Sequence, residues 1–296
     1  MSHKNKKSLT KQVQDVYESK LRIGQSKHKD KHDGVSEDYI YSYGTLKSYL
    51  KEANYFVKFC KQNYGCKTLE QCKPHVAEWI DSRRHLSAYT LKLDLSALAK
   101  LYGVKSNDFG IDTPARVMSK ITRSRGVKKR DKHFSEKRNA DFVEFCKSTG
   151  LRREELTKLR GNMLATDELG RLCIDVTVGS KGGRPRLAPI IGDVEKIKSM
   201  MDVAGKELVF KNVPSGADIH SYRAEYATAI YNHYARPLNR IPYDKINKGT
   251  GKRYQSEVYV CRNENKGKRL DKRAMSEASH ALGHNRLCVV GEHYIR

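Results

Sequence analysis

The 296-residue sequence carries 58 lysine and arginine residues against 34 aspartate and glutamate residues, a formal net charge of +24 at pH 7. Its hydrophobic fraction of 38% suffices for folded cores, yet no stretch approaches the roughly 18–20 apolar residues of a membrane span. The composition therefore argues against a membrane protein and favours a polyanionic partner, with nucleic acid ahead of an anionic membrane surface.

The N-terminal stretch MSHKNKKSLTKQ contains no apolar core of a secretory signal, which predicts an intracellular, cytoplasmic protein. The seven cysteines are scattered and form no C-x-x-C pair, so we expect reduced thiols rather than a disulfide framework. Cys60, Cys66 and Cys72 are evenly spaced, but a zinc site usually requires tight two-ligand clusters. We expect no metal and no other cofactor.

The length suggests about two domains, preceded by a basic segment. Residues 1–38 are rich in lysine, serine, glutamine and aspartate, and the stretch KHKDKHDG at 27–34 has no apolar period. This composition predicts a basic flexible arm, with a short helix near Val13–Leu21 as an option. The arm is either a disordered tail or a segment that follows phosphate groups.

Residues 39–105 show amphipathic patterns that are typical of a small all-helical domain. In the last pattern, at residues 87–103, Leu91, Leu95 and Leu98 fall on one helical face. Most lysines of the domain lie off the apolar stripes, where they could face a nucleic-acid backbone. Residues 106–131 are polar, basic and rich in helix breakers, which predicts an interdomain linker.

Residues 132–296 form the second predicted domain, in which helices surround two strand-like runs. These are RLCIDVTVG at 171–179 and RLAPII at 186–191, and the intervening SKGGRP is typical of a hairpin turn with glycines where a positive φ is needed. The predicted fold class is therefore mainly α with a small antiparallel sheet (α+β).

Four separated stretches of this domain carry candidate chemistry. They are TGLRREEL at 149–156, GSKGGRPRLAPI at 179–190, HSYR at 220–223 and LGHNRLCVVGEHY at 282–294. Each is a weak signal alone. Together, in this order and behind a helical basic domain, they closely resemble the tyrosine recombinase (phage integrase) family. The resemblance covers the second domain by motif and the first only by its helical, basic character.

The resemblance implies an N-terminal core-binding domain, a C-terminal catalytic domain and six catalytic residues. Glu155 falls where the family often has a structural glutamate, whose expected task is to hold the helix or an arginine. Arg153 takes a variable position and is expected to remain surface charge. The implied catalytic residues are Arg152 of the T-G-x-R motif, Lys181 of the hairpin, His220 and Arg223 of the H-x-x-R pair, His284 of L-G-H, and the nucleophile Tyr294.

These residue types suit attack on a phosphodiester. The guanidiniums of Arg152 and Arg223 can grip the non-bridging oxygens of the transition state with permanently charged, fork-shaped donors. A tyrosine is a poor nucleophile at its free pKa of about 10, so it needs local positive charge or a base, for which His220 is the candidate. Lys181 could protonate the leaving 5′ hydroxyl, and His284 could hydrogen-bond a phosphate oxygen.

The resemblance thus implies a site-specific DNA recombinase that cuts and rejoins DNA through a 3′-phosphotyrosine, without metal or ATP. We expect an integrase or transposase of a mobile element. The implied partners are double-stranded DNA, further copies of the chain in a tetramer on two DNA sites, and accessory DNA-bending proteins. The alternatives are a nicking-closing enzyme of the type IB topoisomerase kind and a catalytically silent DNA-binding regulator.

The spacing of the last motifs departs from the family pattern. Arg223 and His284 are about sixty residues apart, where the family usually has roughly two dozen, and the excess is about residues 236–273. Within it SEVYVCRNENKGKRL is a candidate β-hairpin, which is either a surface insertion or an extra contact with DNA or a partner. Tyr294 follows His284 by ten residues rather than the commoner nine, so Tyr259 is kept as the alternative nucleophile.

Overall fold

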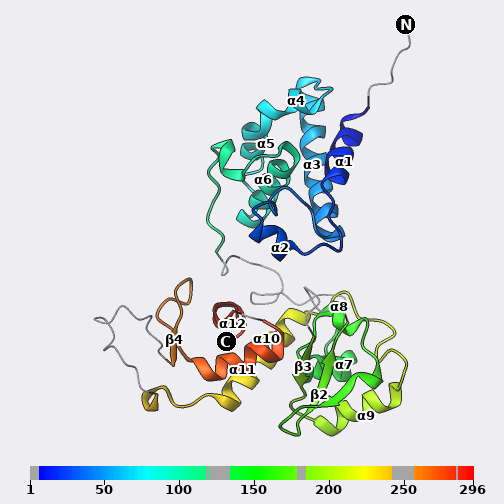
Figure 1. Cartoon of the computed structure of the whole chain (residues 1–296), viewed down its shortest axis with the longest axis vertical. Helices are drawn as coiled ribbons and strands as arrows, with labels where there is room; N and C mark the ends of the chain where they lie inside the picture. Colours follow the sequence, from blue (N-terminus) through cyan, green and yellow to red (C-terminus); the bar gives the residue numbers. More distant parts are fainter. Residues whose placement is uncertain (1–6, 118–119, 121–133, 179–184, 242–256, 285) are drawn as a thin grey trace. The chain divides into compact units, whose positions relative to one another are not determined.

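The structure is a computed structural model that describes residues 7–117, 120, 134–178, 185–241, 257–284 and 286–296. The chain divides into two compact units, residues 1–116 and 117–296 (Figure 1). Within the described part no helix is long and apolar enough to cross a bilayer.

The N-terminal unit is built from helices packed on one apolar core. The side chains of Ser42, Thr68 and Ser87 accept hydrogen bonds from first-turn N–H groups, which fixes where three of these helices begin. Phe56 and Trp79 meet edge-on in the core, with ring centroids 5.3 Å apart. The helices are α1 (Leu9–Ser19), α2 (Lys27–His32), α3 (Tyr43–Tyr64), α4 (Leu69–Cys72), α5 (Val76–Ser82) and α6 (Ala88–Tyr102).

Helix α1 belongs to this core, which differs from the flexible arm expected over residues 1–38. Leu9, Val13 and Tyr17 recur every four residues and are buried. The Tyr17 hydroxyl donates a 2.8 Å hydrogen bond to the carbonyl of Ala97 on α6, and burial raises the pKa of this tyrosine. The lysine-rich composition around α1 concealed a short apolar period that is sufficient to fold it onto α3 and α6.

The start of the predicted linker also packs on the N-terminal core. Residues Ser106–Phe109 form a 3-10 turn, and Phe109 and Ile111 contact the core cluster. The compact unit therefore extends past the boundary expected at residue 105. Most of the rest of the predicted linker, residues 118–119 and 121–131, lies outside the described residues.

The C-terminal unit contains helices and two small antiparallel sheets, so the predicted fold class is confirmed. Its helices are α7 (Ala140–Thr149), α8 (Arg153–Leu156), α9 (Val194–Ala204), α10 (Ile219–Tyr234), α11 (Lys272–Leu282) and α12 (Leu287–His293). Its strands are β1 (Leu164–Thr166), β2 (Leu172–Val176), β3 (Arg186–Pro189), β4 (Val258–Val260) and β5 (Arg269–Asp271). Short 3-10 turns occupy Lys137–Asn139, Gly161–Met163 and Leu238–Arg240.

The first sheet has the strand order β1-β2-β3, with Ile174 opposite Ala188 in its buried centre. The two predicted strands are confirmed as β2 and β3, whereas β1 was missed because three residues are too short to show an alternating pattern. Residues 180–184 of the predicted turn SKGGRP lie outside the described residues. The candidate hairpin within residues 236–273 is confirmed as the antiparallel pair β4 and β5, with Tyr259 opposite Leu270.

Two apolar clusters fill this unit. One joins α7 and α9 to the first sheet, and the other joins α10, α11 and α12 to the β4–β5 hairpin. Helix α11 lies along α10, and α12 packs against α11 (Figure 1). Six of the seven cysteines of the chain are buried, while Cys288 on α12 is exposed.

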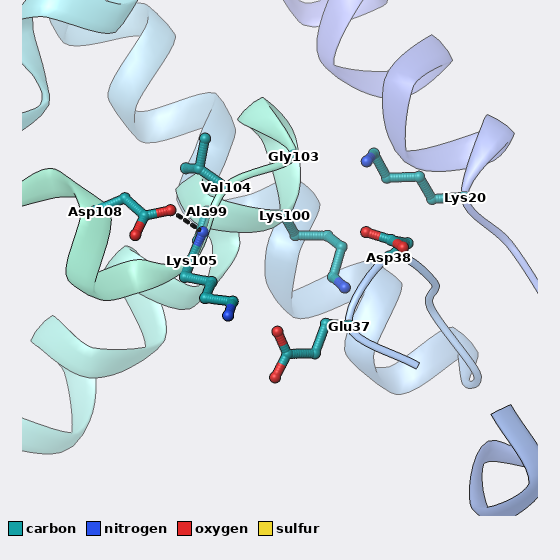
Figure 2. Close-up of a pocket in the computed structure, with 9 residues that line it drawn as sticks. All are labelled: Lys20, Glu37, Asp38, Ala99, Lys100, Gly103, Val104, Lys105 and Asp108. Carbon is teal, nitrogen blue, oxygen red and sulfur yellow. Dashed lines mark hydrogen bonds between the residues drawn. The ribbon is translucent and has the colours of Figure 1, made fainter. Parts of the chain in front are cut away.

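A hollow of about 240 Å³ in the N-terminal unit is lined by charges of both signs (Figure 2). In Figure 2 the Lys100 side chain extends toward Glu37 and Asp38, and burial lowers the pKa of this lysine. Lys20, Lys105 and Asp108 complete its charged lining. Three lysines face three carboxylates there, so the hollow offers no excess charge with which to select a nucleic acid.

The fold makes a prediction that separates a packed helix α1 from a flexible arm. Tyr17→Ala should destabilise the N-terminal unit by about 3 kcal/mol or more, because it empties a fully buried aromatic site. Trp79 is the single tryptophan of the chain and is buried in the same core, so its fluorescence during urea unfolding reports this unit. The exposed neighbour Thr10→Ala should change stability by no more than about 0.5 kcal/mol. Equal stability of the two variants would mean that α1 does not contribute to the core.

Candidate active site

A tight turn between α7 and α8 positions Arg152. Gly150 ends α7 with φ +58°, and a Cβ atom there would lie 2.2 Å from the Tyr226 ring, so the position requires glycine. Arg152 then caps α8. Its N–H and its Nη1 donate to the two carboxylate oxygens of Glu155 at 2.7 and 2.8 Å, and its Nη2 donates to the carbonyl of Leu282 at 3.1 Å.

Arg223 lies in α10 and is only 1% exposed. Its Nη1 donates to the carbonyl of Gly150, and its Nη2 donates to the carbonyl of Leu282 at 3.2 Å. Burial lowers the pKa of this guanidinium to about 10, which still leaves it charged at neutral pH. Its Nε is buried and has no hydrogen-bond partner in the described part of the chain.

The carbonyl of Leu282 brings the two arginines together. Leu282 is the last residue of α11, so its carbonyl has no acceptor role inside the helix and lies at the negative end of the helix dipole. Arg152 and Arg223 both donate to this oxygen through Nη2, at 3.1 and 3.2 Å. The two Nη2 nitrogens are therefore no farther apart than these two lengths added together. A single backbone acceptor therefore sets the spacing of a guanidinium pair.

Tyr294 and His284 complete the group around Arg223. The guanidinium carbon of Arg223 lies 5.8 Å from the centroid of the Tyr294 ring, and the rings of His284 and Tyr294 have centroids 5.1 Å apart. Tyr294 is 8% exposed, and its carbonyl accepts a 3.1 Å hydrogen bond from the Thr228 hydroxyl of α10. Two hydrogen bonds with Ser279 hold the His284 backbone at the end of α11. The structure thus brings together four of the six predicted residues.

The other two predicted residues are placed differently. His220 is exposed in the first turn of α10, three residues before Arg223, and it is not among the four residues that these contacts join. Lys181 lies outside the described residues. The alternative nucleophile Tyr259 lies on β4, whereas the buried arginine contacts the ring of Tyr294.

Arg186 is a site residue that the sequence did not single out. It is the first residue of β3, and its guanidinium donates to both oxygens of Glu155 at 2.8 and 2.7 Å and, through Nε, to the carbonyl of Ala281 at 3.1 Å. A Cβ atom on Gly283 would lie 2.8 Å from the Arg186 side chain, so the end of α11 is shaped around it. The partner Glu155 is 31 positions away in sequence, and no local pattern reports such a pair.

Glu155 holds two arginines, as expected for a structural glutamate. It is 3% exposed, and burial alone would raise the pKa of its carboxyl. Hydrogen bonds from Arg186 and Arg152 outweigh that effect and lower the pKa to about 2. The carboxylate therefore stays charged throughout the neutral range.

The expectation that Arg153 remains ordinary surface charge was wrong. Its guanidinium is half-buried and donates to the carbonyls of Pro214 and Ala217, each at 2.7 Å, and of Ser215 at 3.2 Å. These bonds fix the loop that leads into α10. Sequence reasoning could not find this role, because backbone carbonyls as partners leave no trace in residue identity.

The charges of the site do not balance. Of the three guanidiniums that the contacts above gather, those of Arg152 and Arg186 bond the carboxylate of Glu155, and that of Arg223 bonds backbone carbonyls. Buried positive charge without a matching negative charge is costly unless an anion completes it. Guanidiniums also present paired donors that match phosphate oxygens. In the described part of the chain, no group of three or more His, Cys, Asp or Glu side chains is placed to hold a metal ion.

The sequence matches no family profile and no curated protein. Two similar solved structures are of the Tn1549 transposon integrase, residues 82–397, one in complex with circular intermediate DNA and one, with a tyrosine changed to phenylalanine, in complex with transposon right end DNA. The first is 12% identical over 96% of this chain and 95% of that chain, with a TM-score of 0.45. The second is 13% identical over the same shares, with a TM-score of 0.42. Both TM-scores are low, so this likeness carries no conclusion about the activity of the chain.

The ion pairs of Glu155 with Arg152 and Arg186 predict how the stability of the protein depends on pH. Because the pKa of Glu155 is lowered from its usual 4.5 to about 2, its stabilising effect is present above the usual value and is lost as the pH falls toward 2. Glu155→Gln should cost about 3 kcal/mol at pH 7, since it leaves buried arginines without their carboxylate. Urea unfolding followed by circular dichroism from pH 7 to pH 2 should show the two proteins converging at acid pH. A constant difference across that range would contradict the charged state of Glu155.

Proposed function

We propose that this chain is a site-specific tyrosine recombinase, which cuts and rejoins duplex DNA through a 3′-phosphotyrosine formed on Tyr294. One observation carries the proposal: the buried guanidinium of Arg223 lies beside the Tyr294 ring, and its Nε donor has no partner among the residues that the structure describes. A buried charged donor that no protein group satisfies is placed for a ligand, and a phosphodiester oxygen is an anionic acceptor of the right kind.

The chemistry follows from this placement. With the phosphodiester held by Arg152 and Arg223, the Tyr294 oxygen attacks phosphorus and the bond from phosphorus to the 5′ oxygen breaks. Negative charge builds on the non-bridging oxygens during this step, and the two guanidiniums stabilise it more strongly than in the ground state. The phosphotyrosine conserves the ester bond, so a 5′ hydroxyl of the same or another strand can reverse the step and release the tyrosine.

The proton transfers are assigned to the remaining motif residues. The tyrosine proton passes to His220, and Lys181 gives a proton to the leaving 5′ oxygen, so that charge is balanced in each direction. His284, next to the Tyr294 ring, donates to a phosphate oxygen. The assignment of Lys181 rests on its hairpin motif, and that of His220 on its place one helical turn before Arg223.

The proposed partners are duplex DNA, three further copies of this chain on two DNA sites, and accessory DNA-bending proteins. The net charge of +24 supports a polyanionic partner. We further propose the role of an integrase or transposase of a mobile element, acting on DNA in the cytoplasm.

The nucleophile assignment is tested by trapping. Without divalent metal, the protein should form a covalent adduct on a suicide duplex that carries candidate element-end sequence, and peptide mass spectrometry should place it on Tyr294. Tyr294→Phe should abolish the adduct and retain DNA binding, whereas the matched variant Tyr259→Phe should retain both.

An adduct that survives Tyr294→Phe would contradict the assignment. A change in the linking number of a plasmid without target sites would instead identify a nicking-closing enzyme of the topoisomerase kind. If the protein binds DNA tightly but forms no covalent adduct on any of the duplexes, it is a DNA-binding regulator.

The arginine pair makes a second prediction about the chemical step. Arg223→Lys keeps the positive charge but removes the fork of donors, so the rate of adduct formation at saturating DNA should fall about 100-fold or more. DNA affinity, measured by fluorescence anisotropy, should change far less. The exposed Arg138→Lys is the control and should match the wild-type rate. Circular dichroism verifies that each variant is folded, and an unchanged rate in folded Arg223→Lys would remove this arginine from the reaction.

A further inference from the structure

The β4–β5 hairpin contacts α12, the helix that the proposed nucleophile follows directly. Lys268, just before β5, donates from Nζ to the carbonyl of Ile295 at 3.0 Å. Asn265 donates from its side chain to the carbonyl of Glu292 at 3.4 Å. Both acceptors are backbone carbonyls within two residues of Tyr294. The hairpin thus engages the end of α12 on both sides of the tyrosine.

Glu292 of α12 also bonds the hairpin. The residue is 6% exposed, and its carboxylate accepts hydrogen bonds from the backbone N–H groups of Arg262 at 3.3 Å and Asn263 at 3.2 Å, in the turn after β4. A buried carboxylate that accepts two backbone donors satisfies groups that burial would otherwise leave costly. The carboxylate therefore ties α12 to the turn region of the hairpin.

Apolar contacts reinforce these polar ones. A Cβ atom on Gly291 would lie 3.0 Å from Met275, 3.3 Å from Leu270 and 3.5 Å from Cys261, so α12 approaches the hairpin and α11 at a distance that suits glycine. Leu270 of β5 and Cys261 after β4 are both buried. The glycine allows the backbone of α12 to lie directly on the hairpin.

The base of the hairpin is fixed to the helix that carries Arg223. Asp271, at the end of β5, is fully buried and accepts three hydrogen bonds from Arg236, just past α10, at 2.9 to 3.0 Å. Burial alone would raise the pKa of Asp271, but the bonds from Arg236 lower it to about 2. The N–H of Asp271 also donates to the Tyr231 hydroxyl of α10 at 3.0 Å. The hairpin therefore bridges α10 and α12.

We propose that the β4–β5 hairpin is a positioning device that holds Tyr294 against Arg223, with Glu292 and Lys268 as its positioning residues. Helix α12 has seven residues and Tyr294 follows its last turn, so the helix alone is too short to fix that side chain. Reaction rate is sensitive to such placement, because a displacement of about 1 Å can cost about 100-fold. The catalytic part of this inference rests on the proposed function, and the holding of α12 does not.

The experiment measures holding and catalysis separately in the full chain. The variants are Glu292→Ala, the conservative Glu292→Gln and Lys268→Met, with the exposed hairpin lysine Lys266→Met as the matched control. Amide hydrogen exchange of residues 287–294, read by peptide mass spectrometry, reports whether α12 is held. The rate of covalent adduct formation on a suicide duplex at saturating concentration reports catalysis, and the Kd for that duplex is measured alongside.

Glu292→Ala and Lys268→Met should speed exchange across residues 287–294 and leave α7 unchanged. They should lower the adduct rate about tenfold or more without changing the DNA Kd beyond about twofold. Glu292→Gln keeps an acceptor oxygen and should recover most of the rate, while Lys266→Met should match the wild type in every measurement.

Unchanged exchange in Glu292→Ala and Lys268→Met would overturn the proposal, because the hairpin would then not hold α12. Faster exchange with a wild-type adduct rate would also overturn it, because the held position would not be the reactive one. A wild-type protein that forms no adduct on any duplex would refute the recombinase function instead, and the exchange result would still decide whether the hairpin holds the helix.

Discussion

The carbonyl of Leu282 is the point on which the candidate site depends. It accepts from both Arg152 and Arg223, which come from segments 71 positions apart, and it is free to do so only because α11 ends there. Of the two arginines, Arg152 has a carboxylate partner in Glu155, while the partners of Arg223 within the described ranges are carbonyl oxygens. The protein therefore leaves Arg223 incompletely neutralised, and this is the arginine beside the Tyr294 ring.

Two sets of contacts in the C-terminal unit hold the residues of the candidate site in place. Glu155 and Arg186 join the first sheet to the end of α11, so that the strand following the proposed lysine hairpin is tied to the guanidinium pair. The β4–β5 hairpin joins α10 to the end of α12. The described part of the segment at 236–273, which lengthens the spacing between Arg223 and His284, thus packs against the helix that Tyr294 follows. This favours an internal role for the described part of the insertion over a role as surface decoration.

Much of the site could be predicted because its residues are read by type and order. Arg152, Arg223, His284 and Tyr294 lie in motifs whose order along the chain is informative, and the structure brings them together. The partners of Arg186 and Arg153 could not be predicted, since one is a distant carboxylate and the others are backbone carbonyls. A short helix near Val13–Leu21 was an option for the N-terminal segment, but its packing on the core was not foreseen, because composition averages over a window and three apolar residues among many lysines do not change that average. The hairpin strands were predicted from their own pattern, but their contact with α12 depends on tertiary packing that no local pattern encodes.

The distribution of thiols makes α12 unusually easy to observe. Cys288 is the exposed cysteine of a chain whose other six are buried, and it lies on the helix that ends at Tyr294. Thiol reagents react with accessible thiolates, so a maleimide dye or a spin label should attach to this helix without any engineered cysteine. The native sequence therefore already provides a spectroscopic reporter on the helix that leads to the proposed nucleophile, through which motion of this helix on binding DNA can be followed in real time.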